Sequence, residues 1–234
     1  MIHIDVIEET TVESYTPAAV ILPYEVTGEY YVEELGELDA KPVYSFFKRF
    51  FDIVLSLFAL IVLLIPMLII AVIVKLTSPG SALYKQERLG KDGVSFEIIK
   101  FRSMYVDAEN NGAQWSDGEN DERITPFGKF LRRTRMDELP QFAQILTGKM
   151  SLVGPRPERE CFYEKFETYI HGFSERLKVK PGLTGLAQVS GGYDLRPEEK
   201  VVYDIEYIKK RSLWLDLKCI LLTVRIIFSH NGAR

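Results

Sequence analysis

The adjacent carboxylates of Asp137 and Glu138 are the part of this sequence best suited to catalysis. Arginine fills most of the segment 132–135 before them, and Pro140 follows them. Because proline is tolerated only in the first turn of a helix, we expect Asp137 at or near a helix N-terminus, where free N–H groups stabilise phosphate oxygens. There one carboxylate can attack phosphorus as a nucleophile, and the other can bind Mg²⁺. The local alternative is an aspartate that only caps the helix.

The basic residues Lys100, Arg102, Arg135 and Arg156 are candidates for binding a phosphate group. Arg156 lies between two prolines, which fix the backbone and lower the entropy cost of presenting a guanidinium to a phosphate. A rigid turn with a solvated arginine is the alternative at this position. Lys100 and Arg102 come at the end of a predicted strand and add two further cations.

Several other kinds of site are excluded by motifs that the sequence lacks. It contains no Gly-rich Walker loop, no GxGxxG, no HExxH and no GxSxG. The histidines at positions 3, 171 and 230 are scattered, and Cys161 and Cys219 lack the spacing of metal ligands. We therefore expect buried thiols, and we expect acidic and basic side chains to carry any catalysis.

A long apolar segment from Ile53 to Val74, interrupted only by Ser56 and Pro66, is typical of a membrane helix. Pro66 removes a backbone hydrogen bond near its middle, so the helix must kink or break. Lysine and arginine flank both ends, whereas a spanning helix carries them mainly on the cytoplasmic side. We therefore predict that residues 41–76 form a re-entrant helix that bends at Pro66 and returns to the same face. The alternatives are a single kinked spanning helix and a buried core helix.

Charge divides the chain into two parts. Residues 1–40 contain ten Asp or Glu and no Lys or Arg, which leaves a net charge of +6 for residues 41–234 within the overall −4. The basic part suits anionic lipid and phosphate-bearing substrates. The acidic part has little periodicity, and we expect an N-terminal arm that is disordered or loosely packed and has no catalytic role.

The remaining residues, 77–234, are predicted to form the catalytic domain. Two short strands, 83–89 and 94–101, flank a turn of glycine, lysine and aspartate and predict a β-hairpin. The last predicted helix begins at Trp214, as in amphipathic helices at a membrane interface, although an ordinary core-facing helix fits as well. The fold class is therefore α+β, mostly helical with one β-hairpin, and monotopic in the membrane. Helices are predicted at 126–134, with Thr125 as N-cap, and at 139–146, 158–178, 197–211 and 214–228.

Four motifs occur in a fixed order along the chain: Lys100-Phe101-Arg102-Ser103-Met104, Arg135-Met136-Asp137-Glu138-Leu139-Pro140-Gln141, Gly154-Pro155-Arg156-Pro157 and Pro181-Gly182-Leu183-Thr184-Gly185-Leu186-Ala187-Gln188. With the proline-broken apolar segment, they make the chain from about Tyr44 to Arg234 resemble the bacterial sugar transferases, which are monotopic polyprenol-phosphate phosphoglycosyl transferases. The resemblance implies transfer of a sugar 1-phosphate from a UDP-sugar to undecaprenyl phosphate, with release of UMP. This reaction is the first membrane step of capsule, exopolysaccharide or other glycan synthesis.

The resemblance also implies roles for individual residues. Asp137 matches the nucleophile that forms a covalent phosphosugar intermediate, and Glu138 matches the Mg²⁺-associated acid. Arg156 matches a phosphate-binding arginine, whereas Lys100 and Arg102 match basic residues near the active site. The membrane helix of the family is re-entrant, which implies contact with membrane lipid on the cytoplasmic face of the bacterial inner (plasma) membrane.

Other features stay open. Met136 stands where leucine is usual, a volume-conserving change, and the sequence ends in Gly232-Ala233-Arg234, where related hexose transferases often carry an aromatic residue. No residue identifies the sugar, and we expect glucose or galactose. We expect the form without the four-helix membrane extension of some relatives and no nucleic-acid partner, and a homodimer stays open. The alternative functions are a lipid-diphosphate phosphatase and a non-catalytic membrane-surface adaptor.

Overall fold

The computed structural model describes residues 22, 25–108, 121–191 and 195–229. Within these residues the molecule is a mixed α/β structure in which helices predominate and the strands form three two-stranded sheets. One sheet is the predicted hairpin, and the other two consist of short parallel strands. Most of the predicted acidic arm, most of a polar stretch at 107–122 and the last residues of the chain lie outside the described residues.

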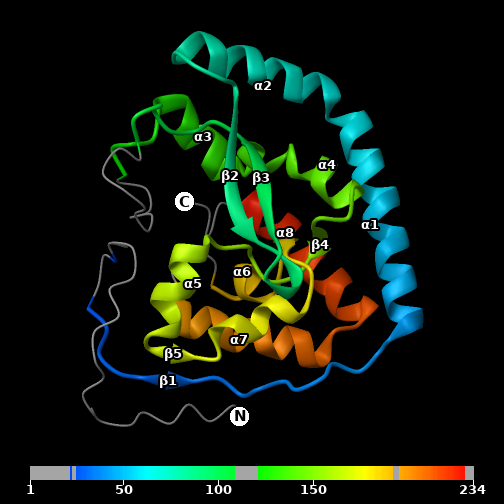
Figure 1. Cartoon of the computed structure of the whole chain (residues 1–234). Coiled ribbons are helices and arrows are strands. Elements are labelled where there is room, and N and C mark those ends of the chain that lie inside the picture. The colour runs from blue at the N-terminus through cyan, green and yellow to red at the C-terminus, as the bar shows by residue number, and fades with distance from the viewer. Residues whose placement is uncertain (1–21, 23–24, 109–120, 192–194, 230–234) are drawn as a thin grey trace.

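The long apolar segment forms two helices, α1 (Pro42–Val62) and α2 (Leu64–Thr77), with a bend of 61° between them (Figure 1). The break falls at Leu63, before the predicted position at Pro66. Pro66 lies in the first turn of α2, where its missing N–H has no cost because first-turn N–H groups lack intrahelical partners. No single helix in the described ranges is long and apolar enough to cross a bilayer, whereas the bent pair has the length and composition of a broken span or a re-entrant loop.

The two sides of α1 differ in polarity. Asp52 and Ser56 are buried against the rest of the molecule, and Lys48 lies one turn before them on the same face. The other side of α1, and most of α2, is apolar and exposed, including Phe46, Phe58, Ile61, Ile65 and Leu68. Helix α1 therefore contacts the rest of the protein through polar side chains and presents an apolar surface on its other side.

The predicted β-hairpin is confirmed: β2 (Leu83–Leu89) pairs antiparallel with β3 (Ser95–Phe101), and the short 3₁₀ turn η1 (Lys91–Gly93) connects them. Ile98 of β3 is buried in the main core. Phe101, at the end of β3, packs in a second apolar cluster with side chains of α2 and of the helix that follows the hairpin. The end of β3 is therefore fixed against both helices.

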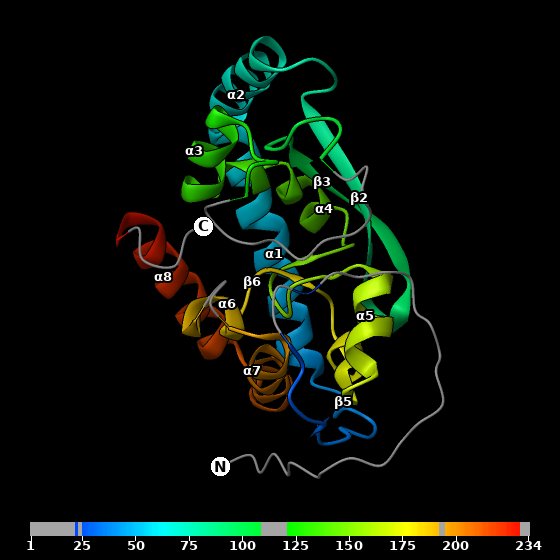
Figure 2. The ribbon, with the colours of Figure 1, turned by 90° about the vertical axis from the view of Figure 1, so that its left-hand side faces the viewer.

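The predicted helices at 126–134, 139–146, 197–211 and 214–228 are confirmed, with differences of at most two residues at their ends. Thr125 is the predicted N-cap, since its hydroxyl accepts a hydrogen bond from the Gly128 amide at 2.9 Å. Figure 2 shows the last helix at the edge of the molecule. The elements are α3 (Pro126–Thr134), η3 (Met136–Glu138), α4 (Gln141–Leu146), β4 (Ser151–Val153), β6 (Gly182–Thr184), α6 (Leu186–Ser190), α7 (Pro197–Lys210) and α8 (Leu213–Ser229).

The prediction of one helix over 158–178 is wrong. The segment forms three elements: α5 (Glu160–Glu167), β5 (Ile170–His171) and the 3₁₀ helix η4 (Phe173–Lys178). Gly172 has a φ of 90°, a conformation that glycine adopts without steric cost and that interrupts a right-handed helix. The apolar residues that suggested the helix still form the centre of the core, where Phe166 stacks on Phe162 and meets Phe173 edge to face.

The acidic arm packs on the domain over the part that the structure describes. Its strand β1 (Tyr30–Tyr31) pairs in parallel with β5, and Val32 and Leu35 lie against the main core. The Leu35 amide donates a hydrogen bond to Glu175 at 2.7 Å. Residues 25–40 are thus more ordered than the sequence indicated, because scattered apolar side chains gain a strand pairing that only the folded domain provides.

The last helix, α8, has one apolar face packed against the core and another that is exposed. Cys219 is buried in the core, whereas Trp214 is 75 % exposed and Leu217, Leu221 and Val224 are exposed along the same helix. Cys219 is a free, buried thiol as predicted, and Cys161 is free but only partly buried. The core-facing interpretation of α8 is therefore confirmed for one side of the helix, and the exposed apolar residues on its other side are compatible with the interfacial interpretation.

Candidate active site

The backbone around the carboxylate pair reverses sharply between α3 and α4. Arg135 adopts a left-handed conformation with a φ of 55°, and the 3₁₀ turn η3 places Asp137 and Glu138 directly after it. A non-glycine residue in this region costs on the order of 1 kcal/mol and is often found at functional sites. The prediction that Asp137 lies at or near the N-cap is wrong: α4 begins at Gln141, and Pro140 occupies its N-cap position. The intervening residues already follow a helical path, which moves Asp137 into a turn of its own.

Glu138 brings two of the predicted cations together. Its Oε1 atom accepts a hydrogen bond from Arg156 Nη2 at 2.5 Å and another from Lys100 Nζ at 3.2 Å. Lys100 comes from β3 and Arg156 from the loop after β4, so the site joins three segments that are far apart in sequence. The Glu138 side chain is only 6 % exposed, and such charge-assisted pairs are strong when water is largely excluded.

The two neighbouring carboxylates have opposite pKa shifts. Burial and the negative charge of Glu138 raise the pKa of Asp137 to about 6. Burial also acts to raise the pKa of Glu138, but the attraction of Arg156 and Lys100 outweighs it and lowers that pKa well below the usual range. Glu138 is therefore a fixed anion, whereas Asp137 changes its protonation state close to neutral pH.

Two arginines of α3 and its C-terminal end complete the positive surroundings. The positive charge of Arg135 contributes to the low pKa of Glu138, as predicted for a residue near the site. Arg132 acts in the same way on Asp137, and its Nε atom donates a hydrogen bond to Ser103 Oγ at 2.9 Å. Arg132 stood out in sequence only as part of a basic segment, so its helical position five residues before Asp137 is the signal that identifies it.

Arg102 does not contact the carboxylate pair. Its guanidinium donates hydrogen bonds to the Ser78 carbonyl at 2.9 Å and to the Pro79 carbonyl, directly after the end of α2. The strand β3 ends at Phe101, so strand alternation no longer holds Arg102 on the same face as Lys100. The prediction of Arg102 as a phosphate ligand therefore has no support from this geometry, and the residue stabilises the exit from the bent helix pair.

A layer behind Arg156 holds its loop rigidly. Arg176 donates to the Arg156 carbonyl at 3.0 Å and forms a 2.6 Å ion pair with Asp204, and both side chains of that pair are almost fully buried. Gly154 is packed so closely that a Cβ atom there would lie 2.4 Å from the Lys180 carbonyl oxygen. The sequence showed the motif with Arg156 but gave no signal for Arg176 and Asp204, because their pairing depends on packing between η4 and α7.

The described residues offer few ligands for a metal ion. No cluster of three or more His, Cys, Asp or Glu side chains that could hold a metal occurs among the described residues. Mg²⁺, however, is commonly bound by one or two carboxylates together with phosphate oxygens of the substrate. Asp137 and Glu138 therefore fit a magnesium ion that arrives with a phosphorylated substrate, and they do not form an all-protein metal cage.

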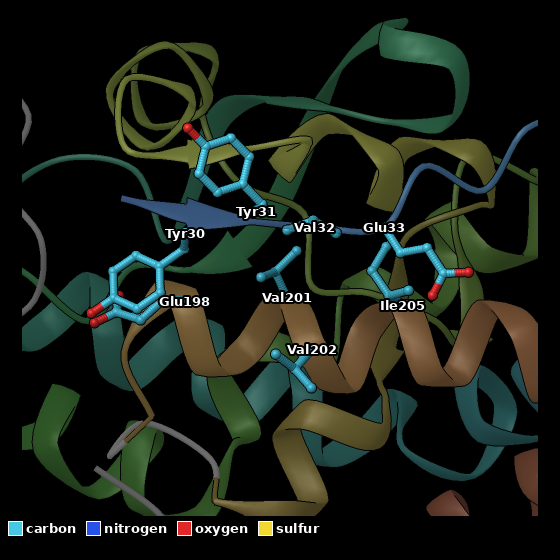
Figure 3. A pocket seen from close by; sticks show the side chains of 8 residues that line it. All are labelled: Tyr30, Tyr31, Val32, Glu33, Glu198, Val201, Val202 and Ile205. Atoms are coloured by element: carbon cyan, nitrogen blue, oxygen red, sulfur yellow. The ribbon is translucent and has the colours of Figure 1, made fainter. Parts of the chain in front are cut away.

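A separate hollow lies between β1 and α7 (Figure 3). It is lined mainly by apolar side chains such as Val32, Val201 and Ile205, with the largely buried Glu198 at its rim. None of the predicted site residues lines it. The candidate active site is therefore the charged cluster at Asp137 and Glu138 and not this hollow.

Known proteins resemble this chain over most of its length. A UDP-N-acetylgalactosamine-undecaprenyl-phosphate N-acetylgalactosaminephosphotransferase of Aeromonas hydrophila is 43 % identical over 204 residues, which cover 86 % of this chain and 48 % of the relative. A UDP-glucose:undecaprenyl-phosphate glucose-1-phosphate transferase of Escherichia coli (strain K12) is 41 % identical over 215 residues, 86 % of this chain and 46 % of the relative. A UDP-galactose-lipid carrier transferase of Erwinia amylovora is 38 % identical over 208 residues, which cover 83 % of this chain and 43 % of the relative.

These relatives differ in the sugar that their names give, and the chain spans less than half the length of each of the three. The family profile described as "Bacterial sugar transferase" matches residues 43–230, which include all of the bent helix pair except Pro42 and every candidate site residue. On this evidence, the chain belongs to the bacterial sugar transferase family.

Proposed function

We propose that this protein transfers a sugar 1-phosphate from a UDP-sugar to undecaprenyl phosphate and releases UMP. The observation that carries the proposal is the buried pair of carboxylates, in which Glu138 is fixed by Lys100 and Arg156 while Asp137 accepts no hydrogen bond from the described residues. The names of the relatives support the substrates, and their different sugars leave the transferred sugar open.

In the first step of the proposed reaction, a carboxylate oxygen of Asp137 attacks the phosphorus that carries the sugar. A phosphorus–oxygen bond forms to Asp137, and the bond to the oxygen of the departing UMP breaks, with UMP taking the electron pair. In the second step, an oxygen of undecaprenyl phosphate attacks the same phosphorus. The bond to Asp137 breaks, which regenerates the carboxylate and gives a polyprenyl diphosphate sugar.

The surroundings of Asp137 suit this chemistry. Arg156 and Lys100 lie where the charge of a transferring phosphoryl group would be neutralised, and such preorganised cations act strongly in a site with little water. Their positive charge, with that of Arg132, keeps the pKa of buried Asp137 from rising beyond about 6, so the nucleophile is mostly ionised at pH 7. Mg²⁺, when bound through Glu138 and phosphate oxygens, would supply further charge neutralisation.

The outer surface supports action at a membrane. The donor is soluble in water, whereas the acceptor is held in a bilayer, so the enzyme must work at headgroup depth. The exposed apolar sides of α1, α2 and α8 provide a large hydrophobic surface, and Trp214 is suited to the headgroup region. We propose that α1 and α2 form a re-entrant membrane helix and that the enzyme lies on the cytoplasmic face of a bacterial inner membrane.

The function is tested by incubating the purified protein with a panel of UDP-sugars, Mg²⁺ and undecaprenyl phosphate. We expect UMP release that requires the lipid acceptor for turnover. Without the acceptor, intact-mass analysis should show one sugar-phosphate increment that is absent from Asp137→Asn. Release of inorganic phosphate would instead indicate a lipid-diphosphate phosphatase, and no reaction with any donor would indicate a membrane-surface adaptor.

The membrane arrangement is tested separately by labelling single cysteines in sealed vesicles. Cysteine is introduced at Ser45, in the first turn of α1, or at Ser81, after the end of α2, in a background that lacks Cys161 and Cys219; both serines are exposed. We expect both positions to react from the same side. Pro66→Leu should shift the population toward opposite-side labelling, because leucine, unlike proline, fits a continuous straight helix, in which the N–H of residue 66 would bond to the Val62 carbonyl. Opposite-side labelling of the unaltered helix pair would contradict the re-entrant arrangement.

A further inference from the structure

The polar face of α1 contacts the segments that lead into and out of the site. Arg49 donates hydrogen bonds to the Ile145 and Leu146 carbonyls, both at 2.7 Å, at the end of α4. Asp52 accepts hydrogen bonds from Ser151 Oγ at 3.1 Å and from the Leu152 amide at 2.9 Å, both in β4. Side chains of α1 thus bind the helix to the end of α4 and to β4.

Lys48 makes the α1 contact nearest to Arg156. Its ammonium group lies 3.0 Å from the Val153 carbonyl, 3.0 Å from Asp216 Oδ2 and 3.3 Å from the Tyr207 hydroxyl. These acceptors use all three N–H donors of the lysine. Val153 is the last residue of β4, and Arg156 follows three residues later.

The other groups of this cluster leave the Val153 carbonyl to Lys48. The Tyr207 hydroxyl is 2.7 Å from Asp216 Oδ1 and 3.2 Å from the Val153 carbonyl, so its single proton goes to the closer carboxylate. Tyr44 donates to the other Asp216 oxygen at 3.1 Å. Lys48 is therefore the side chain that fixes the end of β4 from the α1 side.

The chain between Val153 and Arg156 is too stiff to absorb a shift. The Gly154 amide donates to the Thr184 carbonyl at 2.8 Å, and the Pro155 carbonyl accepts from the Gly182 amide at 2.8 Å. Prolines on both sides of Arg156 restrict the backbone further. Residues 153–155 are thus joined to β6 as one unit that leads directly into Arg156, so a displacement of this unit would reach the Arg156 guanidinium and, through it, Glu138.

We propose that Lys48 is a positioning residue for the active site: from the apolar helix α1 it holds the end of β4 and thereby sets the position of Arg156. The catalytic consequence rests on the function proposed above, whereas the structural part does not. The lysine itself has no contact with Glu138, so it acts only through the β4 segment.

The test needs a variant that separates positioning from folding. Lys48→Met alone leaves the buried Asp216 without its cation, which is destabilising. Lys48→Met with Asp216→Asn removes both charges; the amide oxygen can accept from one tyrosine and the amide N–H can donate to the hydroxyl oxygen of the other, so we expect a smaller loss of stability than in Lys48→Met alone. The matched control is Lys41→Met, since Lys41 also extends from the start of α1 to a backbone carbonyl, that of Arg211 at 3.1 Å, at the junction of α7 and α8.

Two measurements in detergent or nanodiscs decide the proposal. Hydrogen exchange over residues 152–157 should be faster in the double variant than in the unaltered protein and the Lys41→Met control. For a donor that supports turnover, kcat/KM should fall about tenfold in the double variant and stay unchanged in the control. When the double variant is combined with Arg156→Lys, kcat/KM should fall by less than the product of the two separate fold losses, because both changes disturb the same guanidinium.

The outcomes are distinguishable from failure of the proposed function. If the unaltered protein releases no UMP with any donor, the proposed function is refuted. Hydrogen exchange still tests whether Lys48 fixes the end of β4. Unchanged exchange over 152–157 in the double variant would overturn the positioning role. Full activity of the double variant, or losses that multiply with Arg156→Lys, would likewise show that Lys48 only stabilises the fold.

Discussion

Two ionic networks among the described residues, one around Lys48 and one at the candidate site, differ in how completely their charges are paired. In the network of Lys48, every ammonium hydrogen and both oxygens of Asp216 have partners. In the candidate site, Glu138 is paired with two cations, but Asp137 accepts no hydrogen bond from the residues that the structure describes. A saturated network holds elements together, whereas a buried carboxylate without donors keeps its lone pairs for reaction.

The largest expected effect comes from Asp137→Asn. The amide cannot attack phosphorus, so transfer and adduct formation should fall by at least about a thousandfold. The thermal midpoint should not fall, because a raised pKa means that the folded state disfavours the charge that the substitution removes. UMP release measures the activity, and differential scanning calorimetry measures the thermal midpoint. The exposed Asp39→Asn should change neither, and near-normal turnover of Asp137→Asn would refute the nucleophile assignment.

Glu138→Gln should show the opposite pattern in stability. It removes the charge that Lys100 and Arg156 share, so we expect a loss of about 1–3 kcal/mol in the free energy of unfolding and a loss of activity of about a hundredfold. The activity should also depend less on Mg²⁺, because a carboxylate ligand is lost. The matched control is Glu175→Gln, since Glu175 also accepts from a lysine and from a second donor. Equal stability of both variants would contradict the distinct role of Glu138.

Arg156→Lys tests the planar fork of the guanidinium. It keeps the positive charge but loses the bidentate geometry, so we expect a rate loss of about tenfold, equivalent to about 1.4 kcal/mol. Steady-state kinetics measure this effect. Arg211→Lys serves as the control, because the Arg211 guanidinium is also held by hydrogen bonds, in its case to two backbone carbonyls, but lies at the junction of α7 and α8. Unchanged kinetics of Arg156→Lys would show that Arg156 is only a residue of a rigid turn and does not bind substrate.

The smallest effect is the pH dependence of the first step. Only the ionised form of Asp137 is a nucleophile, and its pKa is raised to about 6, so the rate of adduct formation should increase with pH and reach half its plateau near pH 6. Glu138 stays ionised over this range because its pKa is lowered, so it adds no second transition. Rapid-quench measurement between pH 5 and 8 tests this. A rate that is flat down to pH 5 would mean that Asp137 is not buried as described.

The sequence predicted those parts of the molecule that depend on local signals. The hairpin, the Thr125 cap and the break near Pro66 follow from turn residues, capping chemistry and the missing N–H of proline. The helix expected over 158–178 was wrong because a stripe of apolar residues does not show where Gly172 turns the backbone.

The candidate site was only partly predictable for a similar reason. Motif spacing identified Asp137, Glu138 and Arg156 as candidates, and the structure brings Arg156 and Lys100 to one oxygen of Glu138. It places Arg102 elsewhere, because whether a basic residue at a strand end reaches the site depends on the neighbouring helix. The contacts of Lys48 join residues more than a hundred positions apart, and no local pattern encodes such pairings.

The polar face of α1 also has a consequence for the order of events during synthesis. The carbonyls that Arg49 binds come 96 and 97 residues later in the chain, and Asp216, the partner of Lys48, comes 168 residues later. At the usual speed of a ribosome, this delay is on the order of ten seconds. During that time the nascent helix carries charges without their final partners, and charged side chains are costly in hydrocarbon. In the membrane arrangement proposed above, the first half of α1 would therefore stay at the aqueous boundary until these partners are synthesised, while the apolar bend beyond it would enter the lipid first.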